Sequence, residues 1–222
     1  MEKTGLPFSM NEARSLSNDK PYREIRGLQR ADTIRVYQAY SSSIADAAIR
    51  AQTFVAPFKT SRMTWIKPSF MWMMYRSNWG TSNGQERVLA VDIATSGLLW
   101  ALEHGCLSHF DSAFHESTAS WQQQMDDSCV RIQWDPERDV ALERLPYRSI
   151  QIGLTGEAVE RYVTDWIERI EDQTEVVEKI RLASGDEQRL LIESIIQRES
   201  PLKLHPTLAK RIGATDTAGQ AT

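Results

Sequence analysis

The sequence of 222 residues is poor in cysteine and contains no long apolar run. Its two cysteines, Cys106 and Cys129, lack the spacing of metal ligands, and such a pair is typical of reduced thiols in the cytoplasm. No segment approaches the ~18 apolar residues of a membrane span, and the first residues lack the apolar stretch of a signal peptide. We therefore expect a cytoplasmic protein with no membrane partner.

Basic charge is not in excess, because 26 lysines and arginines face 30 acidic residues and the formal net charge is -4. This balance argues against a generally basic nucleic-acid binder, although a local basic pocket on an acidic body remains compatible with it. With 41% apolar residues, the chain is long enough for one good-sized core. Composition leaves the oligomeric state open.

The motifs of common catalytic sites are missing, since the sequence has no P-loop, no GxGxxG turn and no nucleophile elbow. His109, Asp111 and His115 are residue types that bind metals, but their spacing matches no zinc pattern. None of the four histidines has an evident partner for general-base catalysis. We expect no metal site.

Strand and helix patterns alternate along the chain and predict one α+β domain over residues 31–212. We expect a small mixed or antiparallel sheet, flanking helices and a C-terminal helical pair. Residues 1–30 are predicted to form an arm and residues 213–222 a disordered tail. The predicted strands are 34–39, 62–66, 88–94, 130–135 and 148–154; the predicted helices are 44–52, 69–78, 98–104, 156–180 and 187–198; residues 107–127 are expected to be irregular and 137–147 to be a charged connector.

The most distinctive composition is found in residues 62–86, RMTWIKPSFMWMMYRSNWGTSNGQE, which hold three of the seven tryptophans. Arg62, Lys67 and Arg76 lie close to a Gly-containing loop. Arginine offers a planar fork that matches phosphate, lysine adds a point charge, and loop amides can complete an anion site. Alternatively, each cation pairs with an acid such as Glu86 or Asp92 or lies in water, and the pattern alone leaves both interpretations open.

Helical spacing places Trp72, Tyr75, Arg76 and Trp79 on one face of the predicted helix. Such a face could stack against a planar ring, or its aromatic residues could fill the interior, and both alternatives stay open for the three aromatics. The core is expected to contain the other large apolar residues of this helix, Phe70, Met71, Met73 and Met74.

Three carboxylates, Asp92, Asp135 and Glu137, are candidates for acid–base chemistry. Asp92 stands alone in an otherwise apolar strand, whereas the other two lie in the segment QWDPER at a strand end. The alternative for that segment is a structural turn, because Asp-Pro starts turns readily.

The segments RVYQAY (35–40), RMTWIKPSFMWMMYRSNWG (62–80), QWDPER (133–138) and RSIQIGL (148–154) resemble those of domain-of-unknown-function family 4291. The resemblance runs from about Tyr22 to Leu204. It implies no particular activity, but it makes these four segments the places to look for a site. Gln133 and Arg148 are therefore predicted to contact the ligand.

A second resemblance, in the order of elements, is to ADP-ribosyltransferases, whose split sheet binds NAD. In that family an early strand carries Arg or His, a later strand Ser, Thr or Tyr, and a late strand Glu or Gln. Arg35 and Tyr37, then Thr64, then Glu137 or Gln151 follow a similar order. The chain departs from the pattern because it lacks a Ser-Thr-Ser run on the second strand and a Gln-x-Glu or Glu-x-Glu on the late one.

These observations lead to three hypotheses. In the first, the protein is an NAD-dependent transferase that moves ADP-ribose to an acceptor, which could be a nucleic acid. In the second, it is a non-catalytic module for a nucleotide or single-stranded nucleic acid. In the third, it is a structural or partner-binding protein with interior tryptophans. The first hypothesis expects phosphates at Arg35, Arg62, Lys67 and Arg76, ring stacking on Tyr37, Trp65 or Tyr75, and a catalytic Glu137; Arg35 and Tyr37 are also predicted to be catalytic, and Thr64, Trp79, Gln133 and Arg148 to line the site.

Overall fold

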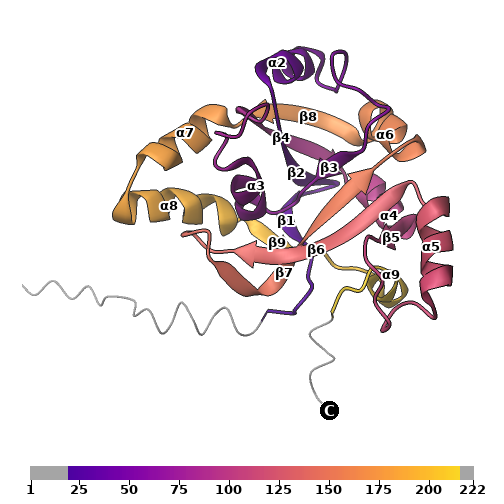
Figure 1. Ribbon diagram of the computed structural model, residues 1–222. Helices are drawn as coiled ribbons and strands as arrows, with labels where there is room; N and C mark the ends of the chain where they lie inside the picture. The colour runs from indigo at the N-terminus through magenta and orange to yellow at the C-terminus, as the bar shows by residue number, and fades with distance from the viewer. Residues whose placement is uncertain (1–19, 216–222) are drawn as a thin grey trace, which may run out of the picture.

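The computed structural model describes residues 20–215, which form two open β-sheets with helices on their outer faces and ends (Figure 1). The first sheet is antiparallel, with the strand order β8 (Ile167–Asp172), β4 (Arg87–Ala94), β2 (Thr33–Tyr40), β1 (Arg26–Arg30) and β9 (Glu199–Pro201). The second is mixed, with the order β3 (Thr64–Ile66), β7 (Arg144–Leu154), β6 (Val130–Arg138) and β5 (Gly105–Leu107), in which β5 and β6 are parallel.

The two sheets meet where β2 passes the end of β3. The backbone N–H of Tyr37 donates to the carbonyl of Lys67 at 2.8 Å, in an isolated antiparallel bridge. Pro68 follows at once and cannot donate to a further strand, so the pairing stops there. Beyond this bridge the sheets are separate.

The main core lies between the inner faces of the sheets. Alternation along β2, β4, β6 and β7 turns every second side chain inward, including Val36, Val91, Ile132 and Ile152, which are fully or almost fully buried. A second cluster covers the opposite face of the first sheet, where α3 (Phe70–Ser77), α7 (Thr174–Leu182) and α8 (Gly185–Ile196) pack. Phe70, Met71, Met73 and Met74 are all buried there, as predicted.

The remaining helices close the ends of the core. Ser69 caps α3 by accepting from the backbone N–H of Trp72 at 3.1 Å. No helix among residues 20–215 is both long enough and apolar enough to cross a bilayer. The other helical segments are α2 (Ser42–Ala51), α4 (Thr95–Glu103), α5 (Thr118–Asp127), α6 (Glu157–Arg161), the π-helical turn η1 (Tyr162–Trp166) and α9 (Pro206–Arg211).

The predicted α+β class is confirmed, but several local predictions are wrong. Residues 26–30, expected in the arm, form β1, because they pair with β2 on one side and β9 on the other. Residues 107–127 were expected to be irregular, yet Ser117 and Ser120 form a capping box that starts α5. The predicted connector at 137–147 is largely hairpin, since Arg138 pairs with Arg144. The rest of the predicted arm, residues 1–19, and most of the predicted tail, residues 216–222, lie outside the described residues.

The long helix predicted over residues 156–180 is also wrong, and the cause is a β-bulge. Ile170 pairs with Val91 and Ile167 with Ile93, so one extra residue, Glu168, sits opposite the bond between Asp92 and Ile93. Two isoleucines three positions apart therefore point toward the same core from an extended strand. Their spacing imitates that of a helix, which explains the incorrect prediction.

Candidate functional site

A cavity of about 700 Å³ opens beside the edge strand β3 and is lined by residues from both sheets, α3 and the segment between α2 and β3. This volume falls within the usual range for ligand pockets, roughly 300–1,000 Å³. We call it the cleft. Of the ligand-contacting residues predicted from the sequence, Arg62, Thr64, Trp65, Lys67, Arg76 and Gln133 line it.

The floor of the cleft is made of buried polar side chains. Gln38 is 2% exposed, and its amide nitrogen donates to the hydroxyl of Thr64 at 2.7 Å and to that of Tyr40 at 2.9 Å. Its carbonyl oxygen accepts from the hydroxyl of Tyr162 at 2.6 Å. Buried polar groups require such partners, and the resulting network holds Gln38 in a single orientation beneath the cleft.

One carboxylate faces the cleft, and two amides hold it. Gln133 donates from Nε2 to Oδ1 of Asp135 at 2.9 Å, and Gln151 donates to Oδ2 at 2.8 Å. The three residues share the outer face of β6 and β7, because alternation sends Trp134 and Ile150 to the core. Each amide keeps its own carbonyl oxygen for another donor, so this wall offers hydrogen-bond acceptors.

Cations surround the opening. Lys59, Arg62 and Arg76 are exposed and line the cleft together with the buried Lys67. None of the four takes part in an ion pair within residues 20–215. The acids that the sequence offered as partners form other contacts. Asp92 binds arginines on its own sheet, and Glu86 accepts from the backbone N–H of Gly84 at 2.7 Å. The four cations of the cleft can therefore bind an external anion.

Lys67 differs from the other three cations because its side chain is only 7% exposed. The pKa of its amine is lowered to about 7, mainly by burial and then by the nearby Arg76 guanidinium, while Asp135 acts in the opposite direction. Its nitrogen makes one long hydrogen bond within the described chain, to the carbonyl of Trp65 at 3.4 Å.

Arg35 and Tyr37, predicted to be catalytic, do not line the cleft. They lie on the face of β2 opposite Gln38, as strand alternation requires. Arg35 donates to Asp92 and to Glu171, so acids on its own sheet neutralise it. The Tyr37 ring is buried and packs edge-on against Phe70, with 5.5 Å between centroids.

Glu137, the third predicted catalytic residue, lines a separate cavity of about 260 Å³ with Ser69, Tyr147 and Glu199. A register irregularity after Pro136 turns the end of β6 away from the line of Gln133 and Asp135. Burial raises the pKa of Glu137. Burial also raises the pKa of Glu199 to about 8, although Glu199 accepts from the backbone N–H of Phe70 at 2.8 Å.

The predicted face of α3 is divided between several environments. Trp72 lines the cleft from a buried position, whereas Tyr75 is 39% exposed and stacks on Trp72 outside the lining residues, with 5.2 Å between centroids. The guanidinium carbon of Arg138 lies over the Tyr75 ring, 3.6 Å from its centroid. Trp79 packs against Phe70 instead, because Asn78 adopts the left-handed φ of 49° and ends the helix before Trp79.

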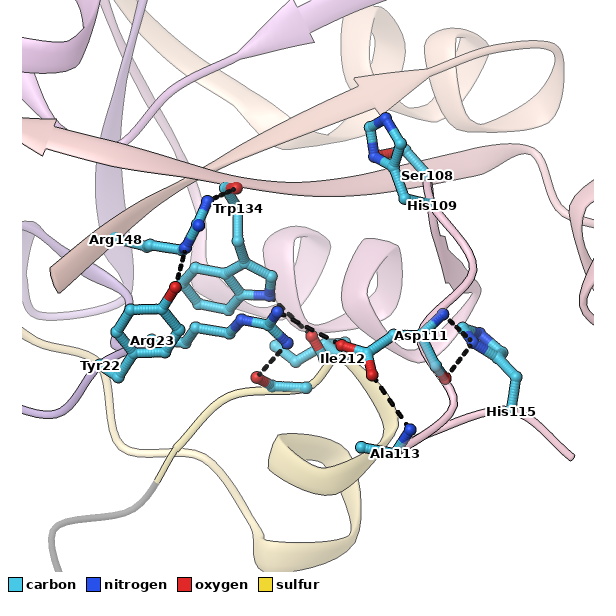
Figure 2. Close-up of polar contacts among 11 residues, drawn as sticks. Tyr22, Arg23, Ser108, His109, Asp111, Ala113, His115, Trp134, Arg148 and Ile212 are labelled. Atoms are coloured by element: carbon cyan, nitrogen blue, oxygen red, sulfur yellow. Dashed lines mark hydrogen bonds and ion pairs between the residues drawn. The ribbon is translucent and has the colours of Figure 1, made fainter.

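Arg148 is also outside the cleft, near the middle of β7, where its side chain lies between Tyr22 and Trp134 (Figure 2). Its guanidinium donates to the Tyr22 hydroxyl at 2.5 Å and to the Trp134 carbonyl at 3.0 Å, which attaches the start of the described chain to the sheet. Figure 2 also shows His109 beside Ser108, while His115 contacts Asp111. No group of three potential metal ligands occurs within residues 20–215.

Sequence reasoning missed Gln38 and Tyr40 as members of the site. Gln38 offered a signal, since an amide on the same strand face as Val36 must find buried partners. Lys59 gave none, because it lies in the irregular segment that follows the cis peptide bond between Ala56 and Pro57.

The fold and the cleft define a mixed α+β domain in which two sheets separate beside a cationic, aromatic-lined pocket. The chain belongs to the family described as Domain of unknown function (DUF4291), whose family model matches residues 24–202. That match includes the cleft-lining residues from Gln38 to Gln151. A search of the curated proteins found no match to the chain.

Proposed function

We propose that the cleft binds a phosphorylated ligand with a planar ring, a nucleotide or dinucleotide, with NAD as the first candidate. The observation that carries this proposal is the charge of the lining. Lys59, Arg62, Lys67 and Arg76 face a single carboxylate, Asp135, among the described lining residues of a protein whose net charge is -4. A cationic cleft on an acidic body attracts an anion to this one place.

The aromatic residues of the lining supply the second part of the proposal. Tyr40, Phe58 and Trp65 contribute to the walls, and each keeps part of its surface exposed. A ring stacked on such residues gains roughly 1–3 kcal/mol, which adds to the attraction of the phosphates.

Thermal stability in the presence of NAD, ATP and AMP tests the proposal. A ligand that binds only the folded state at a concentration 100-fold above its Kd stabilises it by about 2.7 kcal/mol. The double variant R62A/R76A should bind at least about tenfold more weakly, because a hydrogen bond to a charged group contributes roughly 1.5–3 kcal/mol. R189A, on the exposed surface of α8, is the matched control. If the ligands stabilised the wild type, R62A/R76A and R189A equally, the assignment of the ligand site to the cleft would be refuted.

For the reaction, we propose ADP-ribosyl transfer from NAD, supported by the separation of the two sheets beside the cleft. In this step the bond between C1′ of the ribose and the nicotinamide nitrogen breaks, and neutral nicotinamide leaves with the electron pair. An acceptor nucleophile adds to C1′ and releases its proton to solvent. Asp135 is the carboxylate that can stabilise the positive charge developing on the ribose, since Glu137 lies in another cavity. We expect D135N to lose NAD consumption and E137Q to keep it. The reverse result would favour Glu137.

The alternative is a non-catalytic module for a nucleotide or single-stranded nucleic acid. One observation favours it: both oxygens of Asp135 already accept amide donors, which suits a structural carboxylate. Oligonucleotide binding that weakens steeply with salt, without NAD consumption, would support this alternative. Under either function we propose that the protein acts in the cytoplasm, in keeping with the free thiols of Cys106 and Cys129.

A further inference from the structure

The position of Lys67 is fixed by the junction of the two sheets. Its carbonyl accepts from the backbone N–H of Tyr37 at 2.8 Å, and Pro68 restricts the next φ angle. The side chain is buried, yet it belongs to the lining of the cleft. An amine held in this way can reach a ligand but has little freedom to turn into solvent.

The surroundings of this amine differ from those of a structural lysine. Within residues 20–215, no carboxylate oxygen lies within 4.0 Å of the Lys67 amine nitrogen, although a buried ammonium normally requires such a partner. The charged groups that act on it are Arg76 from α3 and Asp135 from β6, and Arg62 lines the same cleft. Because its pKa is lowered to about 7, the Lys67 amine loses its proton far more readily near neutral pH than an ordinary lysine, whose pKa is near 10.4.

We propose that the Lys67 amine is a nucleophile that forms an imine with an anionic aldehyde or ketone bound in the cleft. The nitrogen lone pair attacks the carbonyl carbon, and the carbonyl π electrons move to the oxygen, which takes up a proton. Loss of water from this carbinolamine gives the imine, so that one amine and one carbonyl compound yield one imine and one water. A buried, uncharged lysine beside another cation is a known form of activated nucleophile.

The cleft also defines the class of the carbonyl compound. Arg62 and Arg76 would hold a phosphate or carboxylate group of the ligand while Lys67 meets its carbonyl carbon on the floor. This chemistry goes beyond the proposed function, because binding of a phosphate needs only a positive charge at residue 67. Imine formation needs a primary amine, and arginine cannot replace it.

Reductive trapping tests the proposal. The full chain is incubated at pH 7 with pyridoxal 5′-phosphate, an anionic aromatic aldehyde, and reduced with borohydride, and the modified lysines are located by mass spectrometry. Labelling of Lys67 should be at least about tenfold faster than that of the exposed Lys179 and of Lys59, which lines the same cleft. K67R should lose the adduct at this position, whereas R189A, on the exposed surface of α8, should keep both the adduct at Lys67 and the stabilisation by ATP. Labelling that spreads over the exposed lysines and spares Lys67 would overturn the proposal.

Pyridoxal without the phosphate separates this proposal from the proposed function. If the cleft cations hold the anionic group, pyridoxal should label Lys67 at least about tenfold more slowly than the phosphate ester. Equal rates at Lys67 would leave the reactive amine in place and contradict the anion site. Absence of label at Lys67 from both aldehydes, with ATP still stabilising the protein, would contradict the amine alone.

Discussion

Arg35 donates to both carboxylate oxygens of Asp92, at 2.7 and 2.8 Å, from the neighbouring strand of the first sheet. Both side chains are buried, and Arg30 and Glu171 extend the pair at its edges. A bidentate pair of this kind leaves neither partner free for a ligand. The residue predicted to begin the catalytic set is therefore part of the framework that joins β2, β4 and β8.

The variant D92N should strongly destabilise the protein, because it leaves Arg35 charged and incompletely paired in a buried position. Removal of one partner from a buried ion pair costs about 3–5 kcal/mol, and Glu171 should hold the loss near the lower value. Urea unfolding measures the difference. The matched control is D46N, which breaks the more exposed contact with Arg87 and should cost less than about 1 kcal/mol. Similar losses in the two variants would contradict this account.

Two buried tryptophans differ in whether the indole N–H is bonded. Trp134 donates to the Ile212 carbonyl at 2.7 Å, whereas the indole nitrogen of Trp72 has no partner within residues 20–215. Replacement by phenylalanine removes a similar volume from each site, but only W134F leaves a carbonyl without its donor. W134F should therefore cost about 1–2 kcal/mol more than W72F in denaturant unfolding. Equal losses would indicate that Trp72 has a partner that the structure does not show.

Prediction from the sequence succeeded where one strong local pattern decides the structure. The buried methionines of α3 and the alternation of Ile150 and Ile152 follow from periodicity alone. It failed at Ile167 and Ile170, where a bulge in a strand produces helical spacing, and at residues 26–30, where strand formation depends on β9, far along the chain. Long-range pairing of this kind has no local signal.

The site was predictable in part for the same reason. Arg62, Lys67 and Arg76 lie on one short stretch, so their composition pointed to a common pocket, and the cleft brings them together. Arg35 and Glu137 were added by analogy with the order of elements in another family. Neither joins the cleft, because strand alternation and the irregularity after Pro136 direct them elsewhere.

Glu199 should make stability depend on pH. Burial raises its pKa to about 8, and the nearby Glu137 adds to the effect, while an unfolded chain titrates near 4.3. Between these values the folded state keeps a proton that the unfolded state has lost, so stability falls as the pH rises. E199Q should match the wild type near pH 4 and be more stable at pH 8, as thermal unfolding can measure. E178Q, on the exposed surface of α7, should leave the pH profile unchanged.

The last prediction concerns the ligand-free cleft and follows from the opposite sign at Lys67. Its folded pKa is about 7 and its unfolded pKa is near 10.4, so between these values the unfolded state binds the additional proton and stability rises with pH. Below pH 7 both states are charged, and the folded state bears the full cost of a buried ammonium. K67M removes that cost and keeps a long apolar side chain, so it should stabilise the empty protein by about 2 kcal/mol or more at pH 6 and by less at pH 9.

K67R provides the control, because the guanidinium stays charged throughout this range and should give no such dependence on pH. A bound anion can offset the cost of burying the Lys67 ammonium, because it would stabilise the charged form of the amine. K67M should accordingly bind ATP more weakly than the wild type although it unfolds at a higher temperature. If K67M were no more stable than the wild type at pH 6 and bound ATP equally well, Lys67 would be solvated. The cleft would then lack the buried amine on which its chemistry depends.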